Sequence, residues 1–103
     1  MAYFGNSGVL GANDNTVIAQ HNTDLHDRIT GLIFSDKAGV LHVEQSGDGT
    51  NWDWDDTVTV VVSTGVKFSF ELSGPYVRLR YVNGAAAQTV FRLAARFSSA
   101  GDS

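Results

Sequence analysis

Apolar and polar residues alternate along most of this chain, a pattern that predicts β-strands rather than helices. The clearest case is 66–72, VKFSFEL, where every second residue is valine, phenylalanine or leucine and the residues between are polar. Successive side chains of a strand point to opposite faces, so this pattern predicts a strand with one buried face. The same alternation recurs at 76–82, YVRLRYV, and at 88–97, QTVFRLAARF.

The remaining strands are predicted from β-branched and apolar runs. The stretch 28–35, RITGLIFS, is apolar on both faces, so we expect a central strand, and Gly31 within it indicates a bulge or a close backbone approach. Alanines within 85–94 favour a helix locally, but the period of two at 91–97 favours a strand. The seven predicted strands are 16–20, 28–35, 40–46, 57–63, 66–72, 76–82 and 88–97.

Glycine-containing turns separate these strands at intervals of about ten residues, the spacing typical of an antiparallel β-sandwich, either Ig-like or jelly-roll-like. We expect 36–39, DKAG, to be a hairpin loop between its two neighbouring strands. The turn Gly47-Asp48-Gly49 ends another strand and leads to a corner that holds Trp52 and Trp54. The sequence therefore predicts an all-β sandwich built around the stretch 41–54.

The composition of the chain predicts a division into three segments. Residues 1–15 are rich in glycine and asparagine and are expected to form a flexible N-terminal arm, 16–98 the sandwich domain, and 99–103 a short polar tail. The arm is either a frayed end or a segment that docks on its own sandwich or on a neighbouring subunit. The apolar residues available for docking are Tyr3, Phe4, Val9 and Leu10.

Composition narrows the class of protein. At 103 residues the chain is one domain, and its net charge of −4 argues against nucleic acid as a partner. It has no cysteine, which excludes a disulfide scaffold and leaves the compartment open. We find no signal-peptide pattern and no apolar run of membrane-spanning length, so we expect no membrane association and, for work outside the cell, release by another route such as lysis.

A cluster of oxygen-bearing side chains follows the Gly-Asp-Gly turn. Asp48, Asn51 and Asp53 are spaced so that they could contribute to a calcium site, although the full calcium-loop pattern is missing. Asp and Asn are also what tight turns prefer, so a turn with a solvated acidic rim, continued by Asp55 and Asp56, is the other interpretation. We expect no cofactor.

Four of the seven basic residues fall on two consecutive predicted strands. If these strands form a hairpin, the arginines lie on one sheet surface, where like charges need carboxylates between them. Glu71, Asp27 and Asp36 could supply these within the chain, or an acidic patch of a neighbouring subunit could do so. The residues concerned are Arg78, Arg80, Arg92 and Arg96.

The tryptophans and histidines give weaker indications of function than the charged residues do. Trp52 and Trp54 point the same way if their segment is extended, as a pair of sugar-stacking rings would, with Tyr76 as a third candidate ring. Otherwise one ring is buried and the other anchors an interface. The three histidines are not at metal-ligand spacing, and no nucleophile, zinc-protease or phosphate-loop motif occurs, so we expect no enzymatic activity.

The run 40–97 resembles small β-sandwich virion proteins encoded beside the capsid genes of tailed bacteriophages. The matching stretches are EQSGDGTNWDW and PYVRLRYVNGAAAQTVFRL. The resemblance implies a structural protein of the virion, in first place a capsid decoration (cement) protein on the outer capsid surface, made in the host cytoplasm. Its partners would be the major capsid protein and copies of itself, with a trimer as the expected arrangement.

Within that expectation the contact surfaces are the arm, the acidic corner with Trp54, and the arginine face. Two other roles stay open, namely a carbohydrate-binding or host-adhesion module and a tail or baseplate subunit.

Overall fold

The computed structural model describes residues 2–6, 10–23 and 26–98, and within them it contains eight strands and no helix. Accordingly, nothing in these residues resembles a membrane-crossing helix. The strands are β1 (Ala2–Asn6), β2 (Asn15–Asn22), β3 (Arg28–Ser35), β4 (Gly39–Ser46), β5 (Trp52–Val60), β6 (Val66–Glu71), β7 (Tyr76–Asn83) and β8 (Phe91–Ser98).

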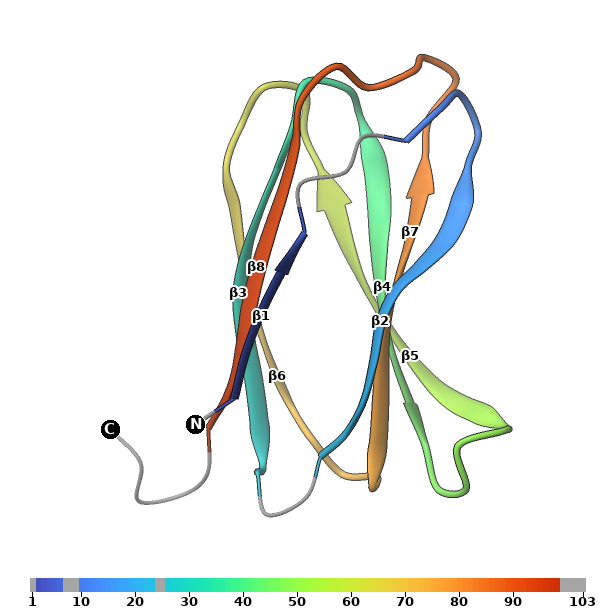
Figure 1. Cartoon of the computed structure of the whole chain (residues 1–103), viewed down its shortest axis with the longest axis vertical. Helices are drawn as coiled ribbons and strands as arrows, with labels where there is room; N and C mark the ends of the chain where they lie inside the picture. The colour runs from blue at the N-terminus through green and yellow to red at the C-terminus, as the bar shows by residue number, and fades with distance from the viewer. Residues whose placement is uncertain (1, 7–9, 24–25, 99–103) are drawn as a thin grey trace.

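The strands form two four-stranded antiparallel sheets that pack face to face (Figure 1). Sheet A has the order β1-β8-β3-β6 and sheet B the order β2-β7-β4-β5. Among consecutive strands of the described chain, only β4 and β5 pair as a hairpin, whereas the others lie in different sheets. The predicted all-β sandwich is confirmed.

The core lies between the sheets and is built from the alternating apolar positions. Ile29 and Ile33 of β3 and Leu41 and Val43 of β4 belong to this core, all with exposed fractions of 1% or less. Burying each such side chain stabilises the fold by about 1.5–3 kcal/mol before the entropy cost of ordering the chain. The period of two on β8 is confirmed by its buried residues Phe91, Leu93, Ala95 and Phe97, which removes the helical alternative.

Strand β3 is central in sheet A, as predicted, but only one of its two apolar faces is covered. Leu32 lies on the outer face, between Lys67 and Ala94 of the flanking strands, and is 57% exposed. Gly31 marks a close approach rather than a bulge, because an added Cβ would lie 2.4 Å from the Phe68 ring and 2.6 Å from the Ala94 carbonyl oxygen. The register of β3 is regular on both sides.

The expected hairpin at 36–39 is wrong. This loop carries the chain from sheet A to sheet B, since β3 pairs with β6 and β8 while β4 pairs with β5 and β7. Asp36 fastens the end of β3 to the segment before β8. Its carboxylate accepts hydrogen bonds from the Thr89 hydroxyl and from the backbone N–H groups of Thr89 and Val90.

The N-terminal segment also differs from the expectation of a loose arm. Residues 2–6 form β1, which pairs along its whole length with β8 at the edge of sheet A. Leu10 is 8% exposed and belongs to the core. Docking on the chain's own sandwich is therefore what the described part of this segment does.

Candidate functional site

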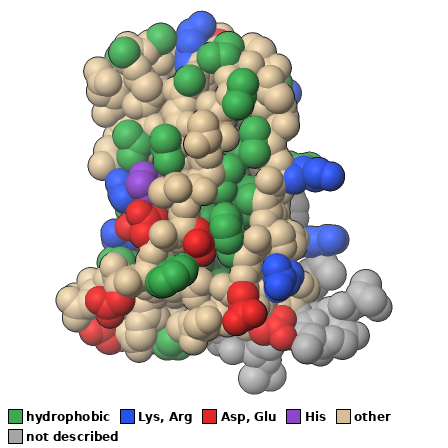
Figure 2. Space-filling model, turned by 180° about the vertical axis from the view of Figure 1, so that it is seen from behind, with side chains coloured by type: hydrophobic (Ala, Val, Ile, Leu, Met, Phe, Trp, Pro, Cys, Tyr) green, Lys and Arg blue, Asp and Glu red, His purple; other side chains and the backbone are tan. Residues whose placement is uncertain are grey.

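One hollow that can receive a ligand lies at the edge where β5 of sheet B meets β6 of sheet A. On the face opposite to that of Figure 1, hydrophobic side chains run down the middle and acidic ones gather toward the lower end (Figure 2). The edge cleft has a volume of about 540 Å³, and its lining residues are Gln45, Ser46, Gly47, Asp53, Trp54, Asp56, Glu71, Ser73 and Gly74.

A β-bulge between β4 and β5 shapes this cleft. Gln45 lies opposite Trp54 and Ser46 opposite Trp52, so Asp53 is one residue more than the partner strand has. A bulge of this kind bends its strand and changes where the flanking side chains point. In a regular strand Trp52 and Trp54 would lie on the same face of the sheet, but the bulge places them on opposite faces.

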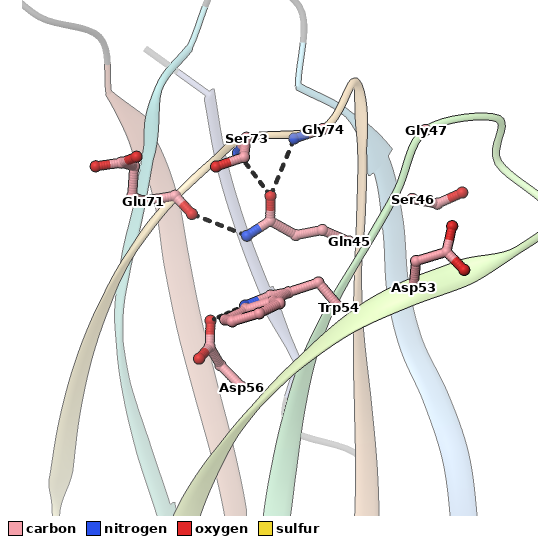
Figure 3. Close-up of a pocket in the computed structure, with 9 residues that line it drawn as sticks. All are labelled: Gln45, Ser46, Gly47, Asp53, Trp54, Asp56, Glu71, Ser73 and Gly74. Carbon is pink, nitrogen blue, oxygen red and sulfur yellow. Dashed lines mark hydrogen bonds between the residues drawn. The ribbon is translucent and has the colours of Figure 1, made fainter.

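Trp54 lies in the edge cleft and is 59% exposed. Its indole Nε1–H donates a hydrogen bond of 2.8 Å to Oδ2 of Asp56, which fixes the orientation of the ring (Figure 3). Trp52 instead packs under the guanidinium of Arg78, 4.4 Å from the ring centroid. The prediction of two indoles pointing the same way is therefore wrong. Trp52 is half-buried and Trp54 is exposed, so the rings lie in different environments, and a role of Trp54 as an interface anchor stays a prediction.

Gln45 forms the wall of the cleft above Trp54 and ties the two sheets together (Figure 3). Its Nε2 donates to the Glu71 carbonyl at 2.8 Å, and its Oε1 accepts from the N–H groups of Ser73 at 2.7 Å and Gly74 at 3.1 Å. The side chain is 5% exposed, so its polar groups are satisfied where burial would otherwise be costly. The wall is thus held in place before any ligand arrives.

Asp53 and Asp56 bring carboxylates to the lining of the cleft, whereas the Glu71 carboxylate points away from it and Glu71 contributes its backbone carbonyl (Figure 3). Among the described residues, the side chains of Asp53 and Glu71 have no hydrogen-bond or ion-pair partner. Asp56 uses one oxygen for Trp54. The cleft therefore offers acceptors and negative charge next to an aromatic surface.

Asp48 and Asn51, two residues of the predicted calcium site, form the hydrogen bonds of a turn. Oδ1 of Asp48 accepts from the N–H groups of Thr50 and Asn51 and from the Ser46 hydroxyl, and Oδ2 accepts from Asn51 Nδ2. These hydrogen bonds, first of all that from the Asn51 backbone, hold the pKa of Asp48 well below its usual range. No group of three or more acidic or histidine side chains in the described ranges is arranged to hold a metal ion. The geometry favours the turn interpretation.

The arginines do not form one face. Arg78 and Arg80 lie on β7 in sheet B, while Arg92 and Arg96 lie on β8 in sheet A. The connection between these strands crosses from one sheet to the other, so the assumed hairpin does not exist. On sheet A, Arg92 covers the Phe34 ring at 4.5 Å and Arg96 donates to the Thr30 hydroxyl at 3.3 Å.

The carboxylate that neutralises the arginines of sheet B is Glu44, not any of those expected. Arg78 Nε donates to Glu44 Oε1 at 2.7 Å, and Arg80 Nε donates to the same oxygen at 3.1 Å. Burial raises the pKa of Glu44, but the two arginine hydrogen bonds outweigh this effect and keep the pKa below its ordinary value of 4.5. A charge triad of Glu44, Arg78 and Arg80 thus lies across β4 and β7.

The other predicted site residues are dispersed. Asp55 is on the outer face of sheet B and accepts from His42 Nδ1 at 2.9 Å, a pair that sequence spacing did not reveal. Tyr3 and Phe4 lie in β1, and Val9 lies outside the described residues. Leu10 is buried in the core and is not a surface contact.

Two parts of the site were missed by sequence reasoning, namely Gln45 and the β6 end with Glu71 and Ser73. A signal for Gln45 was present, because it shares the apolar face of its strand with Leu41 and Val43. A glutamine at an inward position needs polar partners, which predicts backbone groups nearby. No pattern pointed to Glu71 and Ser73, since only the packing of one sheet on the other brings them to Trp54.

Fold and cleft together define a small all-β sandwich module with a preformed cleft at its open edge. The chain belongs to the family described as the N-terminal domain of the uncharacterised protein YqxG, which matches residues 6–98. No curated protein matches it.

Two solved structures share the fold. The crystal structure of PBSX exported protein XepA is similar with a TM-score of 0.88 and 23% identity, covering 95% of this chain and 37% of XepA. A chain from Bacillus endospore appendages, described as a novel family of disulfide-linked pili, gives a TM-score of 0.62 and 19% identity, covering 95% of this chain and 86% of that one. At these identities the likeness establishes the fold. The chain spans little more than a third of XepA's length.

Proposed function

We propose that this chain is a non-catalytic structural module of a phage-derived particle and works outside the cell that makes it. The observation that carries the proposal is the match of 95% of the chain to part of an exported protein, with a TM-score of 0.88. The resemblance of 40–97 to virion proteins of tailed phages supports the same role. A sandwich that matches 37% of the exported protein XepA and 86% of an appendage subunit is suited to use as a building block.

Within this role we place the chain on the capsid surface as a decoration protein that contacts the major capsid protein and copies of itself. The outer face of sheet A supports this placement. Leu32 is 57% exposed there, and Arg96 lies nearby on β8. On sheet B, by contrast, Arg78 and Arg80 already have Glu44 as a partner. An exposed apolar centre with a cationic rim is the composition expected of an interface.

Assembly of this chain would not use disulfide bonds. The appendage subunits are described as disulfide-linked, whereas this chain contains no cysteine. Its contacts must then come from buried apolar area and arginine pairs rather than from cross-links.

The test is to purify particles from a producing culture and to measure how many copies of this chain remain bound. We expect a fixed stoichiometry and, by imaging of labelled particles, a position on the head. Leu32→Asp should reduce the bound copies, whereas Val62→Asp, which changes a valine that is 52% exposed beyond the end of β5, should not. Recovery of the chain only in the soluble fraction would refute the proposal, and label on the tail would replace the capsid placement by a tail role.

A further inference from the structure

The edge cleft has no part in particle assembly as proposed above, and its chemistry suggests a ligand. We infer that the cleft between β5 and β6 binds a neutral saccharide, with Trp54 as the stacking surface and the carboxylates of Asp53 and Asp56 as hydroxyl acceptors. This inference goes beyond the proposed function and does not depend on it.

The first argument is the state of the Trp54 ring. A tryptophan that is 59% exposed leaves much apolar surface in water, which favours a ligand that covers it. The face of an indole carries partial negative charge, so it attracts the weakly positive C–H groups on one side of a sugar ring. Because the bond to Asp56 already orients the ring, little side-chain entropy is lost on binding.

The second argument is the match of acceptors to hydroxyl donors. Sugar hydroxyls that enter the cleft meet the carboxylates of Asp53, which has no partner in the described part of the chain, and of Asp56, which uses one oxygen for the indole. An O–H group that donates to a carboxylate makes a shorter and stronger hydrogen bond than one that donates to a neutral acceptor. The same negative charge repels anionic polymers, so a neutral glycan is favoured over a phosphate- or uronate-rich one.

The third argument is that the cleft is preformed. Gln45 is fixed by three hydrogen bonds to β6 and the residues after it. Gly47 leaves the rim open, since a Cβ added there would meet nothing within 4 Å. A volume of about 540 Å³ lies within the range of small-molecule sites, roughly 300–1,000 Å³. The cleft can thus take a short stretch of glycan without rearrangement.

A cationic peptide is the competing occupant, because a lysine side chain could also lie on the indole and pair with the carboxylates. It is disfavoured because most of the lining of the cleft is apolar, which suits the apolar face of a sugar ring better than an ammonium group. Binding of a peptide instead of a glycan is treated below as a result that overturns the inference.

The experiment is affinity electrophoresis of the whole chain in native gels that contain dextran, a mixed-linkage β-glucan or a galactomannan, with alginate as the anionic comparison. We expect retardation by at least one neutral polysaccharide and none by alginate. Trp54→Ala should weaken the binding about tenfold or more, equivalent to about 1.4 kcal/mol. Asp56→Asn, which keeps an oxygen acceptor for the indole, should weaken it less.

Trp52→Phe is the matched control, because it removes the other indole and leaves Trp54 as the only tryptophan. It should bind as the unchanged chain does, and its fluorescence should change on adding the retarding polysaccharide. Absence of retardation in all three neutral gels, retardation that survives Trp54→Ala, or binding of polylysine alone would each overturn the inference. Since Trp54→Ala leaves the outer face of sheet A intact, it should still associate with particles, so this result is independent of the proposed function.

Discussion

Leu10 and Gln88 hold each other by two hydrogen bonds across the end of the sandwich. The Leu10 N–H donates to Gln88 Oε1 at 2.8 Å, and the Gln88 N–H donates to the Leu10 carbonyl at 2.9 Å. Gln88 Nε2 also donates to the Ser35 hydroxyl at 3.0 Å. All three residues are buried, so this contact joins the segment before β2, the end of β3 and the loop before β8.

Gln88→Ala should therefore destabilise the fold. It leaves the buried Leu10 N–H and the Ser35 hydroxyl without this partner, which costs about 1–3 kcal/mol. Urea unfolding followed by tryptophan fluorescence measures the change. Gln20→Ala, at an exposed position of β2, is the control and should change stability little. Equal effects of the two substitutions would contradict the structural role of Gln88.

Glu44→Gln should also destabilise the chain, because it leaves Arg78 and Arg80 without the carboxylate that they share. Hydrogen bonds to charged groups contribute about 1.5–3 kcal/mol, and the partial exposure of both guanidiniums places the loss at the lower end of that range. The free energy of unfolding at neutral pH tests this. Glu71→Gln removes an exposed carboxylate without such partners and should have a smaller effect.

Stability should fall when the pH is lowered from about 4 to 2. Hydrogen bonds from Thr89 and Val90 lower the pKa of Asp36 from 3.8 to about 2, and those of Glu44 and Asp48 are lowered as well. A depressed pKa in the folded state stabilises above the unfolded pKa, and this contribution is lost as the pH falls through the folded value. Melting temperatures across this range should decrease more steeply for the unchanged chain than for Asp36→Asn. Parallel curves would contradict the role of Asp36.

Gly39→Ala should destabilise the chain by about 1–3 kcal/mol, as overpacking does. An added Cβ would lie 2.2 Å from the Tyr81 hydroxyl and 2.8 Å from the Val82 carbonyl oxygen. Gly65→Ala is the matched control, since a Cβ there meets nothing within 4 Å, and it should be neutral or slightly stabilising. Thermal unfolding of both variants measures the difference, and equal melting temperatures would refute the crowding.

Most strands could be predicted from the sequence, because a strand with one buried face shows a local alternation of apolar and polar residues. Val66–Glu71 and Phe91–Ser98 each present one apolar face, and burial follows that alternation. Strand pairing was not predictable in this way. Asp36 and Gly39 have the composition of a hairpin loop, yet the loop crosses between sheets because β4 finds its partners in β5 and β7.

The candidate site was predictable only in part. Trp54, Asp53 and Asp56 are neighbours in sequence, so their common location was accessible to inspection. Glu71 and Ser73 reach the same cleft from the other sheet, a long-range contact that local patterns do not encode. The separation of Trp52 from Trp54 depends on a register shift, which the alternation of residues alone does not reveal.

That register shift has a consequence for how the surfaces of this family can diverge. Because Asp53 is the supernumerary residue of β5, inserting one residue opposite it in β4, between Gln45 and Ser46, would restore a regular register. Both indoles would then lie on the same face, and Arg78 would lose its aromatic platform. Which surface each tryptophan joins thus depends on the relative lengths of β4 and β5, so an insertion at this point in β4 would change both surfaces at once.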